Sequence, residues 1–142
     1  MIRVLIVDEQ AEVRWGLRMR LAIEPDMAVV GESGNVEEAL SLAQALNPDV
    51  IVVDIGMRGA DGANLVKRLR AAAPAAAVAI LTLRSDVDTF ARAHEAGAAV
   101  FLEKYAGAAD LLQAIRRLAA CGLAEIGCTV TSPLAARRLG VG

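Results

Sequence analysis

The stretch Val50-Ile51-Val52-Val53-Asp54 is a run of four β-branched apolar residues that ends in an acid. A strand that is apolar at every position, without alternation, is typical of a parallel sheet that is covered on both faces. A loop with three glycines, residues 55–62, follows the run. The stretch therefore predicts a buried strand with a polar residue at its carboxyl end.

The same kind of run recurs on both sides of this stretch. Four further short apolar runs predict strands at Arg3–Val7, Met27–Gly31, Val78–Leu81 and Ala99–Leu102. Patterns with helical spacing separate the strands, and they begin at capping signals such as Asn35-Val36-Glu37-Glu38 and Ser85-Asp86-Val87-Asp88. Five strands that alternate with five helices predict an α/β fold, in which helices cover both faces of a doubly wound parallel sheet.

Length and composition limit the classes of protein that need considering. The chain has 142 residues, 56% of them hydrophobic, and a net charge of -2, which favours one compact domain and argues against a basic nucleic-acid binder. No apolar run reaches the roughly 18–20 residues that span a bilayer, and the N-terminus has no signal-peptide pattern, so we expect a cytoplasmic protein that does not enter membranes. We expect one domain over residues 1–121 and a tail or linker over residues 122–142, where glycines and a proline interrupt the pattern.

Polar residues stand at the carboxyl ends of four of the predicted strands. Asp8 and Glu9 follow the first strand, and Asp54 ends the third. Thr82 follows the fourth strand, and Lys104 comes shortly after the fifth. Because sites in open parallel sheets form outside the carboxyl ends of the strands, we expect these five side chains to converge.

Three carboxylates brought together repel one another unless a cation joins them. Mg²⁺ fits best, since it binds one or two carboxylates and keeps several waters. With a metal ion, the Lys104 ammonium and the Thr82 hydroxyl, the site has the charge stabilisation that phosphoryl transfer needs, and Asp54 is the expected nucleophile, forming an acyl phosphate. Each residue alone has an ordinary structural interpretation, as a cap, a turn or a surface residue; their joint placement favours the functional one.

The sequence resembles the receiver domains of response regulators in two-component signal transduction, in particular the NarL/FixJ group with LuxR-type outputs. The resemblance covers residues 1 to about 121. Its most specific motifs are Val4-Leu5-Ile6-Val7-Asp8-Glu9, Val13-Arg14-Trp15-Gly16-Leu17, Val30-Gly31-Glu32, Pro48-Asp49-Val50, Val53-Asp54-Ile55-Gly56-Met57, Leu81-Thr82, Ala96-Gly97-Ala98 and Phe101-Leu102-Glu103-Lys104.

The resemblance implies a flavodoxin-like (CheY-like) fold with five strands in the order 2-1-3-4-5 and five helices. It also implies a phosphorylation-controlled signalling switch rather than an enzyme, apart from catalysis of its own phosphorylation and dephosphorylation. The partner implied is a sensor histidine kinase that phosphorylates Asp54, and a homodimer is expected on activation. By the family pattern, Glu9, Asp54 and the main-chain carbonyl of Gly56 hold Mg²⁺, and Asp8 acts mainly through water. The acid pair here is Asp-Glu instead of the usual Asp-Asp.

Thr82 and Phe101 match the family's switch pair, in which the hydroxyl moves toward the phosphoryl group and the ring turns inward. Three residues near the site depart from the family. Arg58 replaces a usual proline, Leu83 replaces a small residue that would leave more room beside Asp54, and Arg84 follows it.

Two other functions compete with a phosphorylation switch. A receiver-like module that binds or dimerises without phosphorylation is favoured only by Leu83 and the altered loop. A phosphatase of the haloacid-dehalogenase type needs a second acid two residues after the nucleophile, where this chain has Gly56. The segment Thr131-Ser132-Pro133-Leu134 and the residues after it resemble the linker before a LuxR-type helix-turn-helix domain, so we expect any contact with DNA to be made by an output domain outside this chain.

Overall fold

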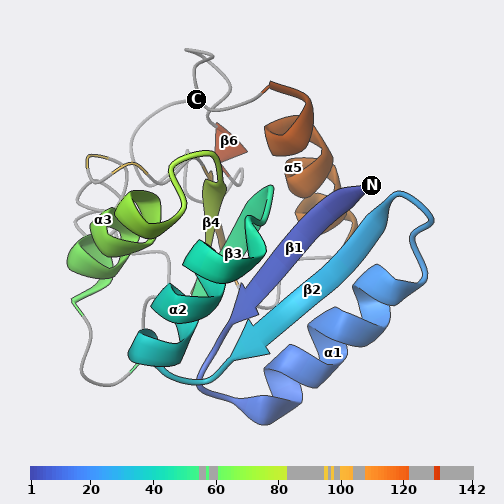
Figure 1. Ribbon diagram of the computed structural model, residues 1–142. Helices are drawn as coiled ribbons and strands as arrows, with labels where there is room; N and C mark the ends of the chain where they lie inside the picture. The colour runs from blue at the N-terminus through green and yellow to red at the C-terminus, as the bar shows by residue number, and fades with distance from the viewer. Residues whose placement is uncertain are drawn as a thin grey trace.

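The structure is a computed structural model that describes residues 1–54, 57, 61–82, 95, 97, 100–103, 108–121 and 130–131. Strands and helices alternate along the chain, and helices lie on both sides of one sheet (Figure 1). The elements in chain order are β1 (Ile2–Val7), α1 (Ala11–Ala22), β2 (Met27–Ser33), α2 (Val36–Leu46), β3 (Val50–Asp54), α3 (Gly62–Ala72), β4 (Ala77–Thr82), β5 (Val100–Glu103), α5 (Ala108–Cys121) and β6 (Val130–Thr131).

Every strand pair in the sheet is parallel, and the order is β2-β1-β3-β4-β5-β6. The first five positions follow the predicted order 2-1-3-4-5. β3 lies between β1 and β4, so Val50–Asp54 forms an interior strand. All five of its residues are buried.

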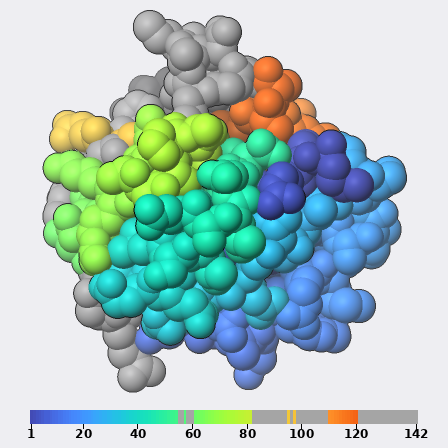
Figure 2. Space-filling view, viewed as in Figure 1, coloured from blue at the N-terminus to red at the C-terminus, as the bar shows by residue number. Residues whose placement is uncertain are grey.

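The interior strands contribute alternate side chains to two separate hydrophobic clusters. Ile51 and Val53 of β3 belong to the cluster that α2 and α3 cover, whereas Val50 and Val52 pack with Leu21 of α1 and with α5 on the opposite face. The continuous apolar run therefore indicated a strand buried on both faces correctly. Figure 2 shows the first face, where α2 and α3 lie over the sheet.

Local capping explains where two of the helices begin and end. The side chain of Asn35 accepts a hydrogen bond from the amide of Glu38 at 2.8 Å, which confirms the predicted cap of α2. α2 ends at Asn47, whose φ of 49° is in the left-handed region, immediately before Pro48. Asp61 caps α3 by accepting a hydrogen bond from the amide of Ala63 at 3.0 Å.

The described sheet has six strands, not the predicted five. The additional strand, β6, lies in the segment expected to be only a tail, and it pairs Val130 with Val100 and Thr131 with Phe101. Val130 and Thr131 are β-branched and suit a strand, but two residues are too few for a periodicity signal. The helix predicted to begin at Ser85 and to end at Gly97 lies mostly outside the described part of the chain, which includes only Glu95 of it, in helical conformation, and Gly97 itself. None of the helices in the described part is long and apolar enough to cross a membrane.

Candidate functional site

The carboxyl ends of β1 and β3 place two aspartates next to each other in the sheet. Val7 pairs with Val53, and the next residues along the two strands are Asp8 and Asp54. Neighbouring strands lie about 4.8 Å apart, so the two acids occupy adjacent positions at one edge. Asp54 is also registered with Leu81 of β4.

Both aspartates are buried, with relative exposures of 1% for Asp8 and 8% for Asp54. Aspartate is almost never buried in a protein unless it is paired or bound to a metal ion. Two buried carboxylates on adjacent strands also repel each other, which a nearby cation would relieve. The placement is therefore that of a charged site and not of solvated turn residues.

The main chain around Asp8 fixes the direction of its side chain. The Asp8 amide donates to the carbonyl oxygen of Ser33 at 3.0 Å, which ties the loop after β1 to the end of β2. Oδ1 of Asp8 accepts from the amide of Gln10 at 2.8 Å, a short turn closed by the side chain. Oδ2 of Asp8 is buried as well.

The donor atoms at this edge suit a hard divalent cation. Carboxylate oxygens are the ligands that Mg²⁺ prefers, and this ion requires only one or two of them beside its waters. Within the described residues, no group of three His, Cys, Asp or Glu side chains is arranged to hold a metal ion. Glu9 is partly buried, and its predicted role as a metal ligand stays a prediction.

The structure places the remaining predicted residues only in part. Thr82 ends β4 and pairs with Glu103, and Phe101 lies within β5, where it pairs with Ile80. Thr82 follows directly after the residue registered with Asp54, so its main chain lies at the same edge of the sheet. Gly56 and Lys104 lie outside the described residues, as do Arg58, Leu83 and Arg84.

Sequence reasoning did not predict a role for Arg14, which contacts the main chain of Asp8. Nη1 of Arg14 donates to the carbonyl oxygen of Asp8 at 2.6 Å, and Nε donates to Oε1 of Glu32 at 3.2 Å. Arg18 also pairs with Glu32. Partial burial acts to raise the pKa of Glu32, but the hydrogen bonds from Arg18 and Arg14 outweigh burial and hold this pKa below its usual value.

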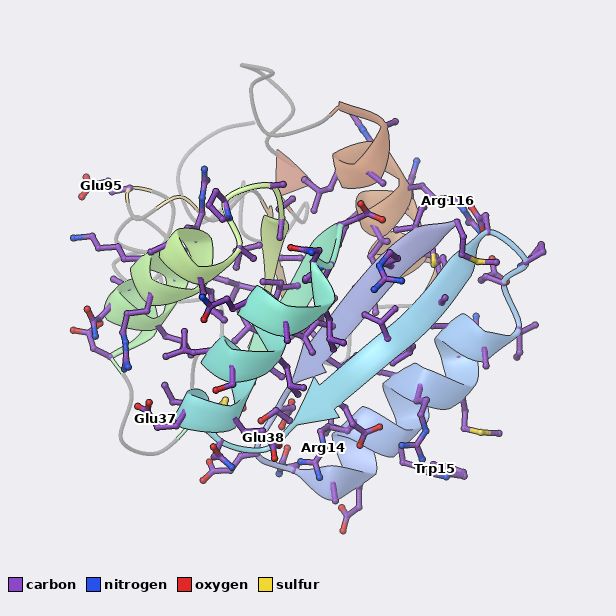
Figure 3. The ribbon with its side chains drawn as sticks, in the orientation of Figure 1. Arg14, Trp15, Glu37, Glu38, Glu95 and Arg116 are labelled. Atoms are coloured by element: carbon purple, nitrogen blue, oxygen red, sulfur yellow. The ribbon has the colours of Figure 1, made fainter. Side chains whose placement is uncertain are left out.

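A second ion-pair cluster lies at the opposite end of the sheet (Figure 3). Arg116 of α5 makes two hydrogen bonds to Asp26, of 2.9 and 3.0 Å, and one to Glu24 at 2.5 Å. The hydrogen bond from Arg116 is the main cause of a lowered pKa at Asp26. This cluster joins α5 to the loop between α1 and β2, far from the aspartates.

Trp15 points away from the sheet on the outer side of α1 (Figure 3). Its relative exposure is 57%. Met19 and Ile23 are also exposed, at 51% and 72%, and follow Trp15 at intervals of four residues. These three residues form an apolar strip on the outer face of α1.

Comparison with known proteins agrees with this geometry. The chain is 39% identical over 116 residues to the transcriptional regulatory protein LiaR of Bacillus subtilis and 30% identical over 117 residues to the nitrate/nitrite response regulator protein NarL of Escherichia coli K12. Each match covers 82% of this chain, but the chain spans only about half the length of these curated relatives, 55% and 54%.

A solved structure matches nearly the whole chain. The two-component response regulator of the LuxR family from Aurantimonas sp. SI85-9A1 superposes with a TM-score of 0.86 at 30% identity, covering 97% of this chain and 94% of that one. Residues 4–116 match the family of the response regulator receiver domain. With its parallel flavodoxin-like sheet and its buried acids at the carboxyl edge, this chain belongs to the response regulator receiver domain family, with relatives of the NarL and LuxR type.

Proposed function

We propose that the chain is the phosphoacceptor switch of a two-component system and that Asp54 receives the phosphoryl group from a sensor histidine kinase. The observation that carries the proposal is the position of Asp54, buried at the carboxyl end of an interior strand and next to Asp8. Burial beside another acid favours binding of a cation by this carboxylate. Neighbouring groups can then stabilise a phosphoryl group attached to it.

The metal in this proposal is Mg²⁺, held by Glu9, Asp54 and the main-chain carbonyl of Gly56, with Asp8 acting through water. When bound, the ion supplies positive charge that offsets the acids and the incoming phosphoryl oxygens. The chain's own contribution is to hold the donors in place: the turn at Asp8 and the rigid end of β3 fix two carboxylates before any ligand arrives.

In the transfer, a carboxylate oxygen of Asp54 attacks the phosphorus of the kinase's phosphohistidine. A bond from that oxygen to phosphorus forms, the bond from phosphorus to the histidine nitrogen breaks, and the nitrogen keeps its electron pair. The Lys104 ammonium and the Thr82 hydroxyl then stabilise the phosphoryl oxygens. Thr82 and Phe101 form the switch, so that a local change in charge alters the surface of β4 and β5.

The output of the switch is proposed to be LuxR-type transcription regulation in the cytoplasm. The support is that the curated relatives are about twice as long as the matched region, and that one of them is a transcriptional regulatory protein. Contact with DNA would then belong to a separate output domain, joined through the residues after β6, with a homodimer forming on activation.

Intact-mass measurement tests the proposal directly. The full chain and Asp54→Ala are incubated with acetyl phosphate, each with and without Mg²⁺. We expect a gain of about 80 Da, one phosphoryl group, in the wild type with Mg²⁺ alone. If the wild type gains no mass under any condition, the alternative of a phosphorylation-independent binding or dimerisation module is supported instead, and Leu83→Ala would then test whether that side chain blocks access.

A further inference from the structure

The loop that carries the two N-terminal acids, residues 8–10, is bonded to a side chain from the helix that follows it. Arg14 lies in the second turn of α1, and its guanidinium extends back toward the start of the helix. Nη1 donates to two consecutive main-chain carbonyls, those of Asp8 at 2.6 Å and Glu9 at 3.3 Å. One cationic group therefore binds the two peptide units on either side of Glu9, Asp8–Glu9 and Glu9–Gln10.

The guanidinium is itself held in place from β2. Its Nε donates to Glu32 at 3.2 Å, and the Arg14 side chain is only 18% exposed. Arg18 pairs with the other carboxylate oxygen of Glu32, so this glutamate is fixed from two sides. Because the hydrogen bonds from Arg18 and Arg14 lower the pKa of Glu32, its carboxylate stays ionised, and keeps its attraction for Arg14, to a lower pH than an ordinary glutamate.

The residue at position 34 leaves room for this arrangement. A Cβ atom on Gly34 would lie 2.8 Å from Nη1 of Arg14 and 3.6 Å from the carbonyl oxygen of Asp8. A larger residue would therefore require the guanidinium to shift away from the loop. The glycine in the loop after β2 and the arginine in α1 are thus matched to each other.

We propose that Arg14 is a positioning residue for the acidic site: anchored by Glu32 and given room by Gly34, it fixes the main chain of Asp8 and Glu9 and thereby the direction of their carboxylates. This inference rests on the proposed function, since it concerns how the same site holds its cation. The alternative is that Arg14 only joins α1 to β2, as Arg116 joins α5 to the loop before β2.

Direct measurement of metal affinity separates the two roles. The probe is Mg²⁺ alone, titrated calorimetrically into the unphosphorylated full chain, and thermal unfolding without metal is recorded for every variant. Groups that orient metal ligands typically change affinity by 10–100-fold when removed. We therefore expect Arg14→Ala to weaken Mg²⁺ binding at least about tenfold.

The control is Arg116→Ala, which removes an arginine that also pairs with two acids but lies at the other end of the sheet. It should lower the melting temperature and leave Mg²⁺ affinity within about twofold of the wild type, because distant sites act independently. Arg14→Lys, which keeps the charge but lacks the planar fork, should restore only part of the affinity.

Gly34→Val keeps the Arg14 side chain but displaces its guanidinium, so this variant provides a second test should Arg14→Ala fold poorly. We expect it to weaken Mg²⁺ binding in the same direction. If the wild type binds Mg²⁺ and the variants at positions 14 and 34 bind it equally well, the positioning role is wrong while the proposed function stands. If the wild type itself binds no Mg²⁺, the metal site of the proposed function is wrong, and the role of Arg14 with it.

Discussion

Neutralising Asp8 tests the buried pair of acids most sharply. In Asp8→Asn the shape is kept, and the side-chain oxygen can still accept the hydrogen bond from the Gln10 amide. What is lost is one of two negative charges buried on adjacent strands. Without metal, this substitution should stabilise the protein, whereas most substitutions of buried residues destabilise.

The size of the effect follows from the strand spacing. Two unit charges about 5 Å apart repel by roughly 3 kcal/mol at an effective dielectric constant of about 20. Exchanging a charged acceptor for a neutral one weakens the bond from the Gln10 amide by about 1 kcal/mol. From the repulsion between the two aspartates and the Gln10 bond alone, the gain is about 2 kcal/mol, which for a domain of this size raises the melting temperature by about 4–8 °C.

The assay is thermal unfolding with and without Mg²⁺. At a hundredfold excess over its dissociation constant, Mg²⁺ should stabilise the wild type by about 2.7 kcal/mol, and the variant much less, so the difference between them should shrink or reverse. Glu37→Gln is the control, because Glu37 is exposed and its pair with Arg68 is worth little. A lower melting temperature for Asp8→Asn without metal would refute the reasoning, since it would show that the Asp8 charge stabilises the fold.

Three further predictions concern the surroundings of the site. The pKa of Glu32 is lowered in the folded state, so its ion pairs stabilise the fold fully above the usual glutamate pKa of about 4.3 and are lost as pH falls through the lower folded value. The difference in unfolding free energy between wild type and Glu32→Gln should therefore be constant near pH 7 and vanish in acid. A difference that persists in acid would contradict this prediction. Asn35→Ala removes the cap on the Glu38 amide and should cost about 1 kcal/mol by urea unfolding with an unchanged m-value. Trp15→Ala should change stability by less than about 0.5 kcal/mol, and wild-type fluorescence should be readily quenched by acrylamide, because the ring is exposed.

The first five strands were predictable because each carries its own signal, whereas their order in the sheet was predicted from the resemblance to receiver domains. β3 has an uninterrupted apolar run, and the structure uses its alternate residues in both clusters. Caps were equally local: Asn35 is followed three residues later by Glu38, and the bond between them is present. These features depend on neighbours in sequence, so sequence alone indicates them.

The features that the sequence did not predict depend on contacts between segments that are distant along the chain. Arg14 was named only as part of a family motif, and its contacts emerge only when β2 brings Glu32 and Gly34 beside it. Val130 and Thr131 form a strand only because the outer side of β5 is there to pair with them. No local pattern in the sequence encodes either contact.

The short strand β6 also covers part of one edge of the sheet. The amide and carbonyl groups along the outer side of β5 would, if exposed, offer a template on which a strand from another chain could add. By pairing with Val100 and Phe101, β6 occupies that template with the protein's own backbone. Val130 and Thr131 thus cover the outer side of two of the four residues of β5, which leaves less of that edge open to a strand from another chain.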